Sequence, residues 1–456
     1  CQYPRGTAPM LSASELDEVV LREVASVDAV DVHTHLLPPT HGQLLLYGVD
    51  ELLTYHYLVA ELFMVLPLDS DDDAVSDALT PPTADEFFAW PKPRQAALVF
   101  EELFVRRTPL SEACRGVVTT LHLLGLGAQL ERAVARGVAR ERRLDELREW
   151  FAAVDKEEYL ELVFTKAKLK YAVMTNVPFA PEEATHFLQE SPPPISPRLK
   201  TALRVDPLLA GDWPAVSAAL AAASPPLAPT LDGCYRYVCA WVDRIQPLYL
   251  MASTPSGFRY EKSSPAAAPP SPAAPPSAAA LLEQVLLRVA VERKLPLAIK
   301  VGAVRGMNAA LRTGGDGVEV ADLRFLRNLC LAYPQVKLLV TVLSTENQHE
   351  LCVLARKFGN LHVYGCWWFC NNPSIIERTT RMRLEMLGTA FTAQHSDARV
   401  LDQLLYKWRH SRAAIGPVLS SQYAKLLEAG WPLTEADIKR DVALLFGGAF
   451  EAFMAK

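Results

Sequence analysis

The sequence predicts an α/β fold: a closed (β/α)8 barrel of the TIM type, with a helical insertion after strand 1. Short apolar or β-branched segments alternate with helical patterns along most of the chain, and eight such strands can be counted. Their near-continuous apolar character is typical of parallel strands that are covered by helices on both faces. An open doubly wound sheet is the alternative, but no G-x-G-x-x-G follows an early strand and no G-x-x-x-x-G-K-[ST] occurs.

The N-terminal part predicts one helix, one strand and a long helical segment. Residues 12–27 begin with serines and acidic residues and carry apolar side chains at helical spacing, which indicates a capped amphipathic helix before the strand at 29–32. The pattern from 48 to 170 is helical almost throughout and is too long for an ordinary loop. We therefore divide the chain into 1–47, the helical insertion 48–170, and 171–456 with the remainder of the barrel and C-terminal helices.

The other seven strands are expected after the insertion. They are 171–177, 199–205, 247–253, 296–303, 336–343, 361–367 and 390–396. A Pro/Ala-rich tract at 263–280 interrupts the alternation after the fourth of the eight strands. Its composition cannot supply a packed core and predicts a disordered excursion.

Composition and charge exclude several classes of partner. Of the 456 residues, 50% are hydrophobic and 21% charged, the balance of a soluble globular protein. A net charge of −6 without a basic block argues against nucleic acid. No apolar run is long enough for a membrane span, and no secretory signal pattern opens the chain. The eight cysteines contain no C-x-x-C pair, which is typical of reduced thiols in a cytoplasmic enzyme. The sequence does not decide whether the protein forms a homo-oligomer.

The first strand ends in two histidines, His33 and His35. Active sites of such barrels lie at the C-terminal ends of the strands, and residues i and i+2 share one face of a strand. Two imidazoles at this spacing can bind one cation. At this point a hydrogen-bonded core histidine and a helix cap are the alternative interpretation.

The last predicted strand adds a carboxylate. His395 and Asp397 follow its apolar run, and in a closed barrel this strand is the neighbour of the first. Two neutral imidazoles and one carboxylate leave a coordination position for water or substrate, as in catalytic metal sites. Asp397 could instead cap the next helix.

Several motifs resemble those of the uronate isomerases, a branch of the amidohydrolase superfamily, and mark the chain as a divergent member. VDVHTHL is similar to the family's DxHxHL, TYHYLVAELF to DHYKWRAM, LRVD to FRPD, GCWWFCNN to GSGWWFND, and HSDARVLDQLLYKWRHSR to TDSRSFLSYPRHEYFR. They occur in the same order over nearly the whole chain. The resemblance implies an aldose–ketose isomerase of hexuronates (glucuronate to fructuronate, galacturonate to tagaturonate) or a related sugar acid, with one divalent ion, expected to be Zn2+.

The resemblance also implies roles for individual residues. The metal ligands are His33, His35 and Asp397. The candidates for proton transfer between C2 and C1 are Asp397, His56 and Tyr57. The substrate-binding residues are Arg399, Arg204, Lys300, Trp367, Trp368 and His410. Arginine suits a substrate carboxylate because its planar guanidinium donates paired hydrogen bonds, although either arginine could serve a structural salt bridge instead.

Lys300 is the main departure from the family, which has a histidine in LHIGA where this chain has IKVGA. A divalent ion repels an ammonium, so Lys300 should pair with a carboxylate such as Asp397 or bind the substrate carboxylate. Deprotonation, carbamylation, a Schiff base and an outward-pointing side chain are the alternatives.

Two other functions compete with isomerisation. A hydrolase would use metal-bound hydroxide on an amide, ester or lactone, with Asp397 as general base. A barrel that only binds a sugar acid would result if Lys300 displaced the ion. The WWF and LRVD motifs favour the sugar-acid branch, with a small-molecule sugar acid as partner.

Overall fold

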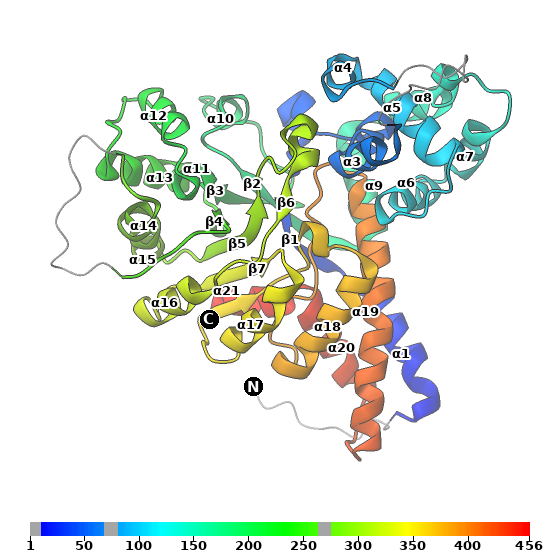
Figure 1. Ribbon diagram of the computed structural model, residues 1–456. Coiled ribbons are helices and arrows are strands. Elements are labelled where there is room, and N and C mark those ends of the chain that lie inside the picture. Colours follow the sequence, from blue (N-terminus) through cyan, green and yellow to red (C-terminus); the bar gives the residue numbers. More distant parts are fainter. Residues whose placement is uncertain (1–10, 68–80, 263–274) are drawn as a thin grey trace.

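A curved, mainly parallel sheet forms the centre of the protein, as seen in the computed structural model, which describes residues 11–67, 81–262 and 275–456 (Figure 1). The strand order is β1-β2-β3-β4-β5-β7-β8, and the short β6 pairs antiparallel with β5. The strands are β1 (Ala29–Thr34), β2 (Leu169–Asn176), β3 (Leu199–Arg204), β4 (Leu250–Pro255), β5 (Leu297–Val304), β6 (Gly317–Val318), β7 (Leu338–Val342) and β8 (Leu361–Val363). The predicted barrel is confirmed, whereas β6 was not foreseen.

The predicted eighth strand at 390–396 is not a regular strand, and here the sequence-based expectation was wrong. The segment nevertheless closes the barrel. On one side the Thr392 N–H donates to Val363 O of β8 at 3.0 Å. On the other side the Asp397 N–H donates to His33 O of β1 at 3.1 Å. Asp397 has a φ of 53°, which is incompatible with β geometry and ends any strand at this point.

Helices surround the sheet. Between β1 and β2 lie α2 (Val49–Leu53), α3 (His56–Val65), α4 (Ala84–Ala89), α5 (Lys92–Phe100), α6 (Glu112–Leu123), α7 (Gly127–Val134), α8 (Asp145–Ala152) and α9 (Lys156–Ala167). Later helices are α10 (Pro181–Phe187), α11 (Asp206–Ala210), α12 (Trp213–Ala221), α13 (Leu231–Ile245), α14 (Ala278–Leu281), α15 (Arg288–Arg293), α16 (Arg324–Ala332), α17 (Thr345–Ala355), α18 (Pro373–Leu387), α19 (Gln403–Glu428), α20 (Glu435–Ala443) and α21 (Ala449–Ala455). None of these described helices is both long and apolar enough to cross a membrane.

The helices between β1 and β2 gather to one side of the barrel, where α6 packs on the long helix α19 (Figure 1). The domain boundaries at 47 and 170 remain a prediction. Of the tract at 263–280, residues 263–274 lie outside the described residues. Its last residues are helical because α14 begins at Ala278, after Ser277, whose side chain accepts a hydrogen bond from the Ala280 N–H. Residues 278–280 are therefore not part of a disordered excursion.

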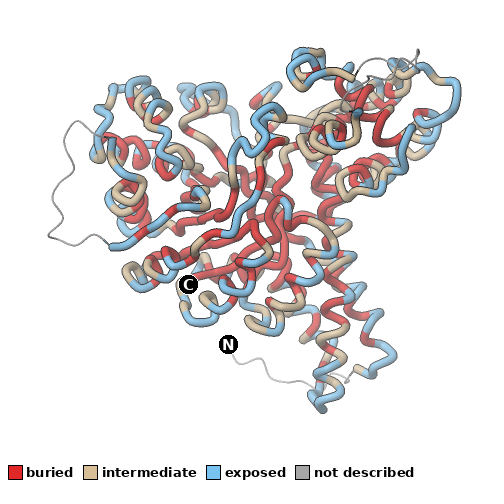
Figure 2. The backbone as a smooth tube through the Cα atoms, viewed as in Figure 1, coloured by how far each residue is buried: buried red, intermediate tan, exposed pale blue. Residues whose placement is uncertain are grey.

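The interior of the barrel is apolar at one end and polar at the other. Val30 and Val32 of β1 pack with inward residues of the other strands, and Phe450 and Phe453 of α21 cover that end. The tube in Figure 2 shows the strands as a buried core inside partly exposed helices. Because this plug fills the end at which the strands begin, the functional side chains collect at their C-terminal ends.

Candidate active site

His33, His35 and Asp397 come together at the open end of the barrel. Their donor atoms lie within 4.8 Å of one another. The Nε2 atoms of His33 and His35 are 3.0 Å and 3.3 Å from Asp397 Oδ1. A bulge in β1 explains why His33 points inward after Val32: from Asp31 to Thr34, β1 advances three residues while β2 advances two, from Ala172 to Met174.

The charge states of these three residues suit metal binding. Burial lowers the pKa of His33 to about 4, and the charge of Lys300 adds to this effect. Burial also lowers the pKa of His35 well below its usual value. For Asp397, burial opposes ionisation, but Lys300 and the two imidazoles outweigh it and hold the pKa of the carboxyl well below its usual value. At neutral pH the set is therefore two neutral imidazoles and one carboxylate.

This donor set fits a divalent ion. Donors about 2.1 Å from a tetrahedral ion lie about 3.4 Å apart, close to the two distances to Asp397 Oδ1. A histidine that binds through Nε2 carries its proton on Nδ1, and for His35 the Thr175 hydroxyl lies 3.3 Å from Nδ1 to receive it. The His33 Nδ1 atom has no hydrogen-bond partner among the described residues. The pair His33 and His35 with Asp397 is thus a coherent N,N,O site.

Lys300 points inward from β5 and is only 2% exposed. Its Nζ atom lies 2.6 Å from His33 Nε2 and donates to Asp397 Oδ1 at 3.0 Å. The ammonium also lies 4.3 Å from the ring centroid of Trp367. Burial lowers the pKa of Lys300 to about 7 although Asp397 opposes the shift. The pairing with Asp397 that the sequence favoured is observed, and the outward orientation is not.

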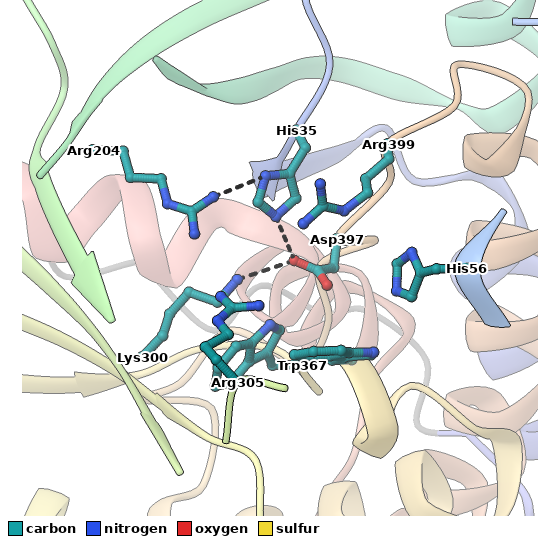
Figure 3. A pocket seen from close by; sticks show the side chains of 9 residues that line it. His35, His56, Arg204, Lys300, Arg305, Trp367, Asp397 and Arg399 are labelled. Carbon is teal, nitrogen blue, oxygen red and sulfur yellow. Dashed lines mark hydrogen bonds and ion pairs between the residues drawn. The ribbon is translucent and has the colours of Figure 1, made fainter. Parts of the chain in front are cut away.

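The two candidate arginines, Arg204 and Arg399, differ in the protein groups that they contact (Figure 3). Arg204 at the end of β3 forms an ion pair with Asp206, and its Nη1 atom lies 3.2 Å from His35 Nδ1. Its guanidinium is thus already held by protein groups. Arg399 follows Asp397, and its side chain lies beside His35 in the same view. Arg399 is therefore better placed than Arg204 to receive a substrate carboxylate.

Most of the other predicted residues also reach the site. His56, Trp367 and Trp368 line the same small space as the cluster, whereas Tyr57 lines the neighbouring cavity. Burial lowers the pKa of His56 well below its usual value and raises that of Tyr57 well above its usual value. At neutral pH both side chains are uncharged.

His410 lies apart from the cluster. Its Nδ1 atom is 2.6 Å from Glu112 Oε1, and its Nε2 atom is 2.9 Å from Thr119 Oγ1, both on α6. Its predicted contact with substrate finds no support in this position. Lys407, one helical turn earlier on α19, lines a cavity next to the site instead.

Two site residues were missed by the sequence analysis. Arg305 lines the space of the cluster and lies 5.7 Å from the ring of Trp368. It follows β5 directly, so the rule that polar residues past each strand belong to the site would have found it. Lys407 is 3% exposed, and nothing in its helical pattern signals a buried ammonium.

The space around the cluster is narrow. It measures about 10 Å3, and two cavities of about 220 Å3 adjoin it, all three sharing His56. The loop 305–316 between β5 and β6 borders both cavities through Gly314. A Cβ on Gly314 would come 3.0 Å from His56 O, which shows how tightly this loop packs on α3. Arg305 and Asp316 fasten the base of the loop through an ion pair of 2.5 Å.

No protein-family model and no curated protein matches the chain, but solved structures do. A uronate isomerase from Bacillus halodurans C-125 is 39% identical, with a TM-score of 0.85 and 98% of each chain covered. A uronate isomerase from Thermotoga maritima (15% identity, TM-score 0.64, 97% and 99% covered) and a glucuronate isomerase from Caulobacter crescentus (14%, 0.68, 99% and 95%) share the fold.

Proposed function

The chain belongs to the uronate isomerase family, and we propose that it interconverts the aldose and ketose forms of a hexuronate, such as glucuronate and fructuronate or galacturonate and tagaturonate. One divalent ion, Zn2+, is held by His33, His35 and Asp397. The observation that carries the proposal is this N,N,O cluster at the C-terminal ends of the strands, in a chain 39% identical to a uronate isomerase. The free, buried thiols of the described cysteines support the expected cytoplasmic location.

The reaction moves one proton between C2 and C1 and passes through an enediolate. The bound ion supplies Lewis-acid stabilisation of that anion. Asp397 is ionised and borders the small space, so it is the anionic group that can take the carbon-bound proton. The neutral His56 faces the same space from α3 and can both donate and accept, which suits a proton moving between O1 and O2. Tyr57 keeps its proton, so it can hydrogen-bond to the substrate but cannot act as a base.

The remaining residues bind and enclose the sugar acid. Arg399 receives the substrate carboxylate, because Arg204 is already paired with Asp206. Trp367 and Trp368 are buried and form an apolar wall that limits water at the reacting carbons. Lys300 stays on Asp397 until an ion or substrate oxygen competes for that carboxylate.

The test is turnover of glucuronate, galacturonate and their ketose partners with and without added Zn2+, followed by NMR in deuterium oxide. An isomerase forms ketose and exchanges solvent deuterium into C2 of the substrate. A hydrolase of the wider superfamily would instead release a new acid from an ester, amide or lactone. Absence of ketose from every hexuronate in the presence of metal would refute the proposal.

A further inference from the structure

Asp397 has a backbone conformation that its side chain disfavours. Its φ of 53° lies in the left-handed region, which costs a residue other than glycine about 1 kcal/mol or more. Such a conformation persists only where neighbouring groups determine it. Because φ of Asp397 fixes where its Cβ points relative to the preceding peptide, this conformation aims the carboxylate at His33 and His35.

The peptide bond between Ser396 and Asp397 is held at both of its polar ends. Its N–H donates to His33 O at 3.1 Å, which ties it to β1. Its carbonyl, Ser396 O, accepts from Lys407 Nζ at 2.7 Å and from Asn371 Nδ2 at 2.9 Å. A rotation of this peptide would break all three hydrogen bonds, so the peptide cannot turn without cost.

Helix α19 holds Ser396 through two consecutive residues. Lys407 donates a hydrogen bond to the Ser396 carbonyl, as described. Trp408 contacts the Ser396 N–H indirectly, through the carboxylate of Asp31. The Trp408 Nε1–H donates to Asp31 Oδ2 at 2.8 Å, and the Ser396 N–H donates to Asp31 Oδ1 at 3.0 Å. Two side chains of one helical turn thus set the orientation of the residue before Asp397.

Burying the ammonium of Lys407 is costly, and burial lowers its pKa to about 8 although the charges of Asp397, Asp31 and Glu112 oppose the shift. The rings of Tyr55 and Tyr57 lie at 6.0 Å and 5.8 Å from Nζ and offer only weak compensation. A structural helix at this position would be served better by an apolar side chain. The buried ammonium is explained by the hydrogen bond that it donates to the Ser396 carbonyl.

We propose that Lys407 is a positioning residue, which acts through the Ser396 carbonyl to keep Asp397 in the left-handed conformation that metal binding requires. The inference rests on the proposed metal site. It goes beyond the proposed reaction because it gives α19 a role in orienting Asp397, which lies outside the regular strands of the barrel.

The experiment compares Lys407→Met, which keeps the length of the side chain but removes the donor, with Lys407→Arg, which restores a donor. Lys337→Met is the matched control, because Lys337 Nζ also donates to a backbone carbonyl, Met454 O, at 2.7 Å but at the opposite end of the barrel. Two quantities are measured: hydrogen exchange of residues 394–400 in the metal-free proteins, and the Kd for Zn2+ by competition with a chelator.

We expect Lys407→Met to exchange the Asp397 amide at least about tenfold faster and to bind Zn2+ about 10- to 100-fold more weakly, the range for residues that orient metal ligands. Lys407→Arg should recover part of both effects, and Lys337→Met should show neither. Unchanged exchange and Kd in Lys407→Met would overturn the positioning role. If the wild-type protein bound no divalent ion, the metal site would be refuted, and the exchange measurement alone would decide the role of Lys407.

Discussion

Replacing Lys300 by methionine tests whether its ammonium opposes or supports the ion. In the structure the ammonium lies 2.6 Å from His33 Nε2 and 3.0 Å from Asp397 Oδ1. An ion bound to the same two atoms would stand about 4 Å from it. With Asp397 bound, a divalent ion leaves about one net positive charge, and two unit charges at 4 Å repel by about 4 kcal/mol at an effective dielectric constant of about 20.

Because the pKa of Lys300 is about 7, its amine can lose the proton when the ion binds, so Lys300→Met should bind Zn2+ only about twofold more tightly at pH 7 and about tenfold more tightly at pH 6, where the ammonium dominates. In the metal-free protein the effect has the opposite sign. Asp397 loses its buried cation there, which costs about 3–5 kcal/mol of folding free energy when no other charge compensates. Arg204 and Arg399 lie nearby, so the lower end of that range applies.

The assay combines chelator competition for the Kd of Zn2+ with chemical unfolding of the metal-free protein. Lys300→Gln, similar in length and uncharged, serves as a second variant and should change both quantities in the same directions. Weaker Zn2+ binding in both variants would refute the reasoning, because it would mean that the Lys300 amine contributes to the ligand set.

Three further outcomes follow from the structure. A chelator should abolish turnover, and added Zn2+ should restore it. Zn2+ at 100 times its Kd should also raise the unfolding free energy by about 2.7 kcal/mol. Turnover that survives complete metal removal would contradict the metal site. Burial raises the pKa of Asp402 to about 6, so the folded carboxyl keeps a proton that the unfolded chain releases near pH 4. The unfolding free energy of the wild type should thus fall by about 3 kcal/mol relative to Asp402→Asn between pH 4 and 7, and parallel denaturation profiles would disprove this. Gly365 has a φ of 62°, and a Cβ at this position in Gly365→Ala would lie 1.7 Å from His395 Nδ1. We therefore expect the free energy of unfolding, measured by thermal or chemical denaturation, to fall by about 3 kcal/mol. A variant as stable as the wild type would show that His395 can move freely.

That His33, His35 and Asp397 come together could be predicted because the signals are local. His33 and His35 directly follow an apolar run, and Asp397 follows the last such run of the chain. Because active sites of such barrels lie at the C-terminal ends of the strands, these residues are expected to lie close together. The irregular backbone of 390–396 was not predictable in the same way, since its apolar pattern is that of a strand. An aspartate tolerates positive φ better than most residues but rarely requires it, so Asp397 gives no signal of its own.

Residues on helices were harder to place. His410 and Lys407 lie on the same helix, and the motif resemblance favoured His410. In the structure the rotation of α19 turns His410 toward Glu112 on α6 and Lys407 toward Ser396. That rotation depends on how α19 packs against α1 (Ala13–Ser26), α6 and α18, which is a property of the tertiary structure and cannot be read from local periodicity.

The narrowness of the space around the cluster has a consequence for how the substrate enters. About 10 Å3 is room for a single water molecule and not for a sugar acid. A hexuronate can therefore reach the cluster only if this space widens, and the loop 305–316, which borders both neighbouring cavities, is the segment that we expect to move.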